Sequence, residues 1–126
     1  MITGWGNYIQ RNYKANIYYP KELDSLKNLL SKKGLKSLPI RGNGRSYGDS
    51  SINKNILSLK KLKKIIKIDK QKLILYCSSN CTIGEINKEL LKKNLFFKVS
   101  PGTKFVTIGG AIASDIHGKN HHHEGC

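Results

Sequence analysis

Residues 42–51 constrain the fold most, because three glycines and three serines share these ten positions directly after the strand-like segment 38–41. Glycine takes positive φ at little steric cost, so closely spaced glycines can turn successive N–H groups toward one point and form an anion nest. A pyrophosphate would fit such a nest, but the loop taken alone is interpreted as a plain glycine turn after a strand, with the pyrophosphate site as the alternative. A Walker loop would end in Gly-Lys-Ser/Thr, and a Rossmann fingerprint would need its third glycine one place earlier and a helix at once. Neither motif is present.

The hydrophobic pattern on both sides of this loop predicts an α+β fold that opens with a β-α-β unit. A helix is expected over residues 21–33, with leucines on one face and Gly34 as its stop signal. A second helix, over residues 82–94, begins at a capping box formed by Thr82 and Glu85. Strands are expected at residues 15–19, 38–41, 56–59, 64–69, 73–77 and 96–99, and the fourth and fifth of these form a hairpin.

The net charge alone does not separate a solvated basic surface from one that binds nucleic acid or an anionic membrane. The formal net charge is +15, and among the 23 basic residues only Arg11, Arg41 and Arg45 are arginines. Scattered lysine indicates a solvated surface more than a phosphate-reading patch, which tends to use arginine. No nucleic-acid-binding signature is present, so a basic module that binds nucleic acid or anionic membrane is the weaker alternative, supported by charge alone.

Cysteine usage and hydropathy bear on location. The three cysteines, an odd number without the spacing of a disulfide framework, favour a reducing compartment and therefore the cytoplasm. No stretch reaches the ~18 apolar residues of a membrane span, and the first residues lack the pattern of a secretory leader.

A second cluster of small residues lies between positions 101 and 114. Pro101-Gly102-Thr103 is followed by Thr107 and then by Gly109-Gly110-Ala111-Ile112-Ala113. The pattern is typical of a helix that lets a neighbouring backbone or ring system approach closely, and the N-terminus of such a helix favours negative charge. Tight helix packing without a ligand is an equal alternative.

The histidines at positions 117 and 121–123 form the third cluster. His117 and His121 would share a face of a helix, but Gly118 and Asn120 argue against a helix here. No cysteine lies at ligand spacing, so we expect no metal site.

In this order the three clusters resemble the FAD-binding domain of the vanillyl-alcohol-oxidase/p-cresol-methylhydroxylase (PCMH) type. Within that family the sequence is most similar to the oxidase subunits of decaprenylphosphoryl-ribose 2′-epimerases and to related FAD-linked sugar oxidases. The resemblance covers nearly the whole chain, from Gly4-Trp5-Gly6 onward. It implies two small α/β lobes that enclose the dinucleotide, with residues 1–126 as the N-terminal part of the domain and the rest of it, with a substrate domain, downstream.

The resemblance also implies which residues bind FAD. At the position where many sugar-lactone oxidases of this family carry a histidine bonded covalently to flavin, this chain has Arg45, so noncovalent FAD is expected. The implied cofactor-binding residues are Arg41, Gly42, Asn43, Gly44, Arg45, Ser46, Tyr47, Pro101, Gly102, Gly109, Gly110, Ala113, His117 and Gly118.

The implied activity is oxidation of a sugar hydroxyl by hydride transfer to FAD. His117 would orient the substrate or assist proton transfer, since imidazole exchanges protons near neutral pH, and Lys119 would pair with a substrate phosphate. Structural hydrogen bonding beneath the flavin is the alternative for both. The expected substrate is a sugar or a polyprenyl-phosphate sugar, with aldonolactones and alditols as alternatives. A partner reductase for epimerisation and peripheral contact with the inner face of the membrane are further expectations. The fragment alone is expected to be inactive and to bind FAD poorly.

Overall fold

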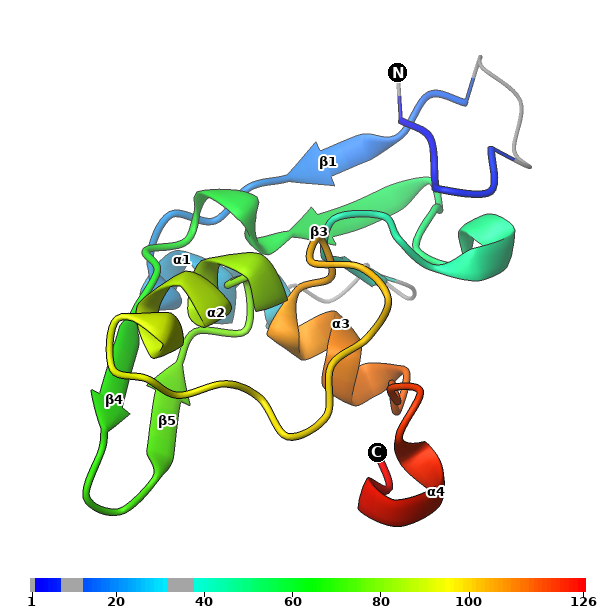
Figure 1. Cartoon of the computed structure of the whole chain (residues 1–126). Helices are drawn as coiled ribbons and strands as arrows, with labels where there is room; N and C mark the ends of the chain where they lie inside the picture. The colour runs from blue at the N-terminus through cyan, green and yellow to red at the C-terminus, as the bar shows by residue number, and fades with distance from the viewer. Residues whose placement is uncertain (1, 8–12, 32–37) are drawn as a thin grey trace. The chain divides into compact units, whose positions relative to one another are not determined.

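The computed structural model describes residues 2–7, 13–31 and 38–126. The chain divides into two compact units, Met1–Lys63 and Lys64–Cys126, and each combines strands with helices (Figure 1). The α+β class predicted from the sequence is therefore confirmed. Each unit is described by itself below.

The first unit is built on a small parallel sheet. Strand β1 (Asn16–Tyr18) is followed by helix α1 (Leu23–Leu30), strand β2 (Ile40–Arg41) and strand β3 (Asn55–Ser58). The strand order is β1-β3-β2, so β3 lies between the two strands of the predicted β-α-β unit, and both of its neighbours run parallel to it. Two short 3-10 helices, Tyr47–Asp49 and Leu59–Lys61, flank β3 in sequence.

The central strand β3 is buried on both of its faces. Ile56 and Leu57 are fully buried, and since successive side chains of a strand point to opposite faces of the sheet, both faces of β3 are covered. Helix α1 is amphipathic as predicted, yet Leu23 and Leu30 remain 63% and 59% exposed. Residue 33 and the predicted stop at Gly34 lie outside the described residues, so the expected end of this helix is not tested.

The second unit begins with the predicted hairpin. Strands β4 (Ile66–Asp69) and β5 (Ile74–Cys77) pair antiparallel. Their inward side chains pack against helix α2 (Ile83–Leu91), whose Ile86 and Leu90 form the core together with Cys81. Helix α3 (Ile108–Ala113) and the one-turn helix α4 (His121–Glu124) follow.

The second unit corrects two expectations. Residues 96–99 do not form the predicted strand: Leu95 and Phe97 pack against the core, and no strand in the described residues pairs with this segment. The alternating apolar pattern thus reflects packing against α2, not a sheet. The histidine run also contains a helix after all, although it begins only at His121, beyond the unfavourable Gly118 and Asn120.

Helix α2 starts as predicted and ends three residues earlier than expected. The Thr82 side chain accepts a hydrogen bond from the Glu85 backbone N–H at 3.1 Å, while the Glu85 carboxylate accepts from the Thr82 N–H at 2.8 Å. Asn94 takes a left-handed φ of +57° in the turn that follows the helix. A left-handed Asn is a common way to end a helix, so the stop signal was present in the sequence and lies just past Leu91.

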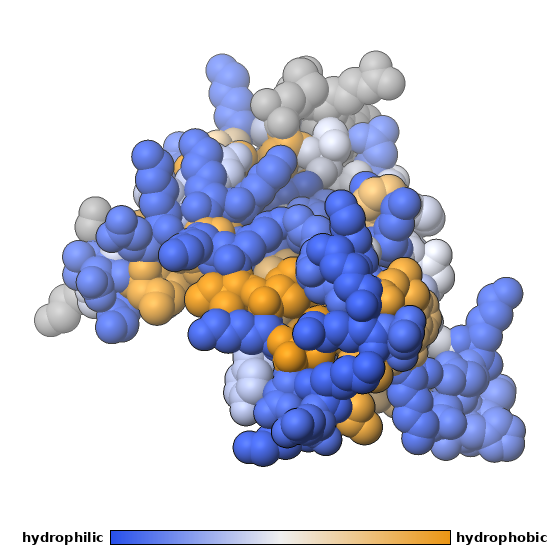
Figure 2. All heavy atoms as spheres, turned by 60° about the vertical axis from the view of Figure 1, so that its left-hand side comes forward, coloured by the Kyte–Doolittle hydropathy of each residue, from blue (hydrophilic) through white to orange (hydrophobic). Residues whose placement is uncertain are grey.

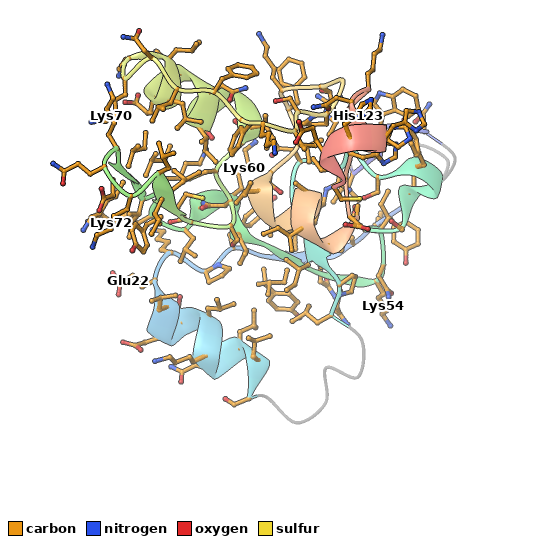
Figure 3. All side chains as sticks on the ribbon, turned by 60° about the horizontal axis from the view of Figure 1, so that its bottom comes forward. Glu22, Lys54, Lys60, Lys70, Lys72 and His123 are labelled. Atoms are coloured by element: carbon orange, nitrogen blue, oxygen red, sulfur yellow. The ribbon has the colours of Figure 1, made fainter. Side chains whose placement is uncertain are left out.

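One face of the molecule is mostly hydrophilic (Figure 2). Hydrophilic side chains cover most of the face drawn in Figure 2, and hydrophobic atoms show between them. Lys70 and Lys72, at the turn of the β4–β5 hairpin, extend away from the ribbon in Figure 3. No helix in the described ranges is both long and apolar enough to cross a membrane.

Candidate cofactor-binding site

The glycine-rich loop of the first unit has the backbone geometry that its sequence predicts. Gly44 and Gly48 adopt φ of +64° and +66°, in the left-handed region that favours glycine. A side chain on Gly48 would meet no atom within 4 Å, so the surface of the loop is open there. Gly42, Asn43 and Arg45 are exposed. Gly44, by contrast, is buried and Ser46 half-buried, so the open part of the loop surface lies at Gly42, Asn43, Arg45 and Gly48.

Arg41, a predicted cofactor ligand, stabilises this loop through hydrogen bonds of its guanidinium to other residues of the first unit. Its guanidinium donates to the Thr3 carbonyl at 2.6 Å and to Ser51 Oγ at 3.0 Å. A Cβ on Gly44 would lie only 2.1 Å from Arg41 Nη2, so the absence of a side chain at Gly44 makes room for the guanidinium. Burial lowers the pKa of Arg41 and the nearby Asp49 carboxylate raises it. The Arg41 side chain thus serves to hold the loop in shape.

Asp49 and Trp5, neither of which has a predicted role, contribute to the structure of this loop. A Cβ on Gly4 would lie 1.6 Å from Asp49 Oδ1, so the opening segment crosses directly over the buried Asp49. One residue later, the Trp5 ring meets the Tyr47 ring edge-on, with centroids 5.2 Å apart. Tyr47 is 81% exposed and Trp5 60%, which leaves both rings accessible to a ligand. The aromatic residue between two glycines, Gly4-Trp5-Gly6, was the available signal.

Helix α3 of the second unit does not offer its N-terminus to an anion. The Ile108 and Gly109 N–H groups donate to the carbonyls of Cys81 and Ser79 at 2.8 and 2.9 Å. The Gly110 N–H donates to Thr107 Oγ1 at 3.2 Å. The N–H groups of Ile108, Gly109 and Gly110 are thus satisfied within the unit.

Gly109 packs closely on Ser79, which leaves little room for a side chain at this position. A Cβ there would approach Ser79 Cβ to 3.0 Å and the Ser79 carbonyl oxygen to 3.1 Å. A Cβ on Gly102, by contrast, would meet no atom within 4 Å. Of the small residues predicted to line the cofactor, Gly102 and Ala113 are exposed, whereas Pro101, Gly109 and Gly110 are half-buried.

The histidine cluster is brought together by a turn of the chain. The ring centroids of His117 and His121 are 5.0 Å apart, and those of His121 and His122 are 4.0 Å apart. His117 and Lys119 are exposed, and Gly118 between them is buried. Within the described part of the chain, no three histidine, cysteine or acidic side chains are arranged to hold a metal ion.

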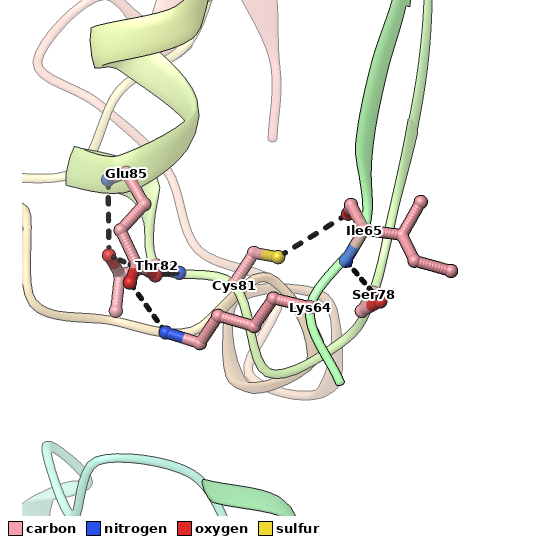
Figure 4. A network of polar contacts seen from close by, with 6 residues as sticks. All are labelled: Lys64, Ile65, Ser78, Cys81, Thr82 and Glu85. Carbon is pink, nitrogen blue, oxygen red and sulfur yellow. Dashed lines mark hydrogen bonds and ion pairs between the residues drawn. The ribbon is translucent and has the colours of Figure 1, made fainter. Parts of the chain in front are cut away.

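A polar network fixes the start of α2 against the hairpin (Figure 4). Lys64 Nζ donates to Glu85 Oε1 at 2.5 Å, and the Ile65 N–H donates to Ser78 Oγ at 2.9 Å. The hydrogen bond from Lys64, followed by that from the Thr82 N–H, lowers the pKa of Glu85. Sequence reasoning found the capping pair but not Lys64, whose contact spans 21 positions.

These features fit a large anionic dinucleotide such as FAD. The loop of residues 42–48 combines left-handed glycines with exposed main chain and Arg45, which suits phosphate oxygens. The exposed Trp5–Tyr47 pair of the same unit suits a flat aromatic ring. These features of the first unit are those expected of a nucleotide-cofactor-binding domain.

Comparison with known proteins identifies the family. The family model for the FAD-binding domain matches residues 15–126, and the chain therefore belongs to this FAD-binding domain family. The prediction of FAD as the cofactor is thereby confirmed.

Two characterised relatives are similar to parts of the chain. Decaprenylphosphoryl-β-D-ribose oxidase of Mycolicibacterium smegmatis is 37% identical over 97 residues, covering 75% of this chain and 21% of the relative. A D-lactate dehydrogenase of Anaerostipes hadrus is 30% identical over 71 residues, covering 56% of this chain and 15% of the relative. The chain thus spans about a fifth or less of the length of these relatives.

Proposed function

We propose that this chain supplies FAD-binding residues to an enzyme that oxidises a sugar or polyprenyl-phosphate sugar hydroxyl. The match to the FAD-binding family over residues 15–126 carries the proposal. The similarity to decaprenylphosphoryl-β-D-ribose oxidase favours a lipid-linked sugar over an aldonolactone or an alditol. D-Lactate dehydrogenase as a relative makes a 2-hydroxy acid the second candidate substrate.

In this proposal, the residues that the family resemblance implies bind the cofactor. The backbone of Gly42, Asn43, Gly44 and Ser46 binds the pyrophosphate, assisted by the Arg45 cation. Arg41 acts indirectly, because its guanidinium is engaged with Thr3 and Ser51. The remaining predicted ligands are Tyr47, Pro101, Gly102, Gly109, Gly110, Ala113, His117 and Gly118.

The chemistry that bound FAD supplies is acceptance of a hydride from the carbon of an alcohol. His117 and Lys119 act on the substrate as the catalytic residues. The exposed His117 imidazole is free to accept the hydroxyl proton or to orient the hydroxyl. Within the described residues Lys119 forms no ion pair, so its ammonium is available to a substrate phosphate.

FAD is held without a covalent bond, since Arg45 stands at the position of the flavin-linked histidine. The proposal extends to a reductase partner that completes an epimerisation and to cytoplasmic location with peripheral membrane contact. Outward-pointing lysines such as Lys70 and Lys72 favour an anionic membrane surface (Figure 3).

The full-length protein tests these points directly. We expect oxidised-flavin absorbance after purification, and acid precipitation should leave the FAD in the supernatant. Anaerobic mixing with a polyprenyl-phosphate ribose should bleach that absorbance, while D-lactate and an aldonolactone should not. A colourless protein would refute the function, a yellow precipitate would refute noncovalent binding, and bleaching by D-lactate alone would select the second candidate.

A further inference from the structure

The one-turn helix α4 is attached at both of its ends to a single residue, Lys98. Asn120, which precedes the helix, donates from Nδ2 to the Lys98 carbonyl at 3.0 Å. Glu124, the last residue of the helix, forms an ion pair with Lys98 Nζ. A single helical turn does not persist by itself, because nucleation costs more than one turn of hydrogen bonds returns. Contacts outside the helix therefore hold it in place.

The turn before α4 is packed closely on the same segment. A Cβ on Gly118 would lie 2.7 Å from the Ser100 carbonyl oxygen and 2.7 Å from Asn120 Oδ1. The Asn120 amide thus lies against Gly118 with one end and bonds Lys98 with the other. Because Gly118 separates His117 from Lys119, this amide links the predicted catalytic stretch to the segment that ends at Pro101.

The His117 ring depends on the same turn. His121 Nδ1 lies 3.1 Å from the Gly118 carbonyl oxygen, and the His121 ring lies beside that of His117. Movement of the turn would therefore displace the ring against which the His117 imidazole rests. Asn120 has the only side chain in the described part of the chain that bonds this turn to the Lys98 main chain.

We propose that Asn120 is a positioning residue, whose side-chain amide fixes His117 and Lys119 for their action on substrate at the bound flavin. The inference rests on the proposed function. Asn120 acts through its hydrogen bond to the Lys98 carbonyl, a main-chain acceptor that does not change rotamer as a side chain does. The Glu124 ion pair is secondary, because the Lys98 side chain is 78% exposed and solvent screens such pairs.

The first experiment measures the attachment in the full-length apoprotein by hydrogen exchange with mass spectrometry. Asn120→Ala should raise exchange in residues 117–124 and leave the α2 region unchanged. His123→Ala is the matched control, since within the described residues its side chain forms no hydrogen bond or ion pair. Asn120→Asp keeps the shape of the side chain and removes the donor, so it should behave like Asn120→Ala even if the alanine variant folds poorly.

The second experiment measures the two-electron reduction potential of bound FAD. The family resemblance implies that Lys119 also lies beside the isoalloxazine ring, on its substrate side. A cation there stabilises the reduced anionic ring, so a displaced Lys119 lowers the potential. We expect Asn120→Ala to retain FAD and lose about tenfold in its preference for reduced flavin, about 30 mV for two electrons. His123→Ala should stay within about threefold of the parent, a difference of about 15 mV by the same relation.

The outcomes separate this inference from the function beneath it. Raised local exchange together with a lowered potential supports the positioning role. FAD retained at an unchanged potential in both Asn120 variants overturns the role while the oxidoreductase stands. Unchanged exchange overturns the attachment itself, and a full-length parent that binds no FAD overturns the function and the inference with it.

Discussion

Replacing Gly44 by alanine tests the geometry of the cofactor loop most sharply, because two separate penalties meet at this residue. The backbone has a φ of +64°, and a Cβ would lie 2.1 Å from Arg41 Nη2. A non-glycine residue in the left-handed region costs about 1–2 kcal/mol. The new methyl would in addition force the guanidinium out of its place.

The size of the second penalty follows from what the guanidinium does. It donates to the Thr3 carbonyl at 2.6 Å and to Ser51 Oγ at 3.0 Å. A hydrogen bond to a charged group contributes about 1.5–3 kcal/mol, and we take the lower end because Arg41 is half-exposed. With one or both bonds lost, Gly44→Ala should destabilise the loop by about 2.5–5 kcal/mol in total.

Two other glycines serve as graded controls. Gly48→Ala has the same backbone penalty, since φ is +66°, but no clash, so it should cost only about 1–2 kcal/mol. Gly102→Ala has neither penalty, so in urea unfolding it should stay within about 0.5 kcal/mol of the parent.

The assay is titration of FAD into the full-length apoprotein, with urea unfolding in parallel. Each 1.4 kcal/mol corresponds to about a tenfold change in an equilibrium constant, so Gly44→Ala should weaken FAD binding by at least tenfold more than Gly48→Ala. If Gly44→Ala and Gly48→Ala had equal effects on FAD affinity and on unfolding, the hydrogen bonds of the Arg41 guanidinium would not stabilise the loop, and the reasoning would be refuted.

Two further substitutions test the second unit. Lys64 lowers the pKa of Glu85, so the stabilisation from the charged carboxylate is present above its ordinary value of 4.5 and is lost as pH falls through the lowered folded value. Glu85→Gln should therefore destabilise α2 at neutral pH by no more than about 1 kcal/mol, since the Lys64–Glu85 pair is partly exposed. The substitution should also flatten the acid side of a curve of unfolding free energy against pH. An unaltered acid slope would contradict the Lys64–Glu85 contact. Gly109→Ala should cost about 1–3 kcal/mol in thermal or urea unfolding, because the methyl would press on Ser79 at 3.0 Å, and a neutral result would mean that α3 does not pack there.

Features encoded by nearby residues were predictable from the sequence. The capping box of Thr82 and Glu85 depends on a spacing of three residues, and the structure has both of its hydrogen bonds. The hairpin was recognisable because β-branched and aromatic residues alternate on both sides of a short turn. The left-handed glycines of the loop at residues 42–48 were likewise legible, since few other residues adopt that backbone conformation.

Features set by distant contacts were not predictable in the same way. The segment at residues 96–99 looked like a strand, because packing of Leu95 and Phe97 against α2 produces the same alternation as a sheet face. The insertion of β3 between β1 and β2 depends on register between segments about 40 positions apart, for which no local pattern exists. The supporting role of Arg41 was hidden as well, because nothing in the sequence says that its side chain reaches back to Thr3.

The small residues of the second unit show why a motif alone does not locate an anion site. Gly109 and Gly110 suggested a helix start that receives a phosphate, but the N–H groups there already donate to Ser79 and Thr107. A buried donor with a protein partner has nothing left to offer a ligand without breaking that bond. The N–H groups of residues 108–110 are therefore engaged, whereas the loop at residues 42–48 with its left-handed glycines keeps its proposed role in binding the FAD pyrophosphate. A phosphate-mimicking anion should therefore protect the backbone of residues 42–48 from hydrogen exchange and give no protection to residues 108–111.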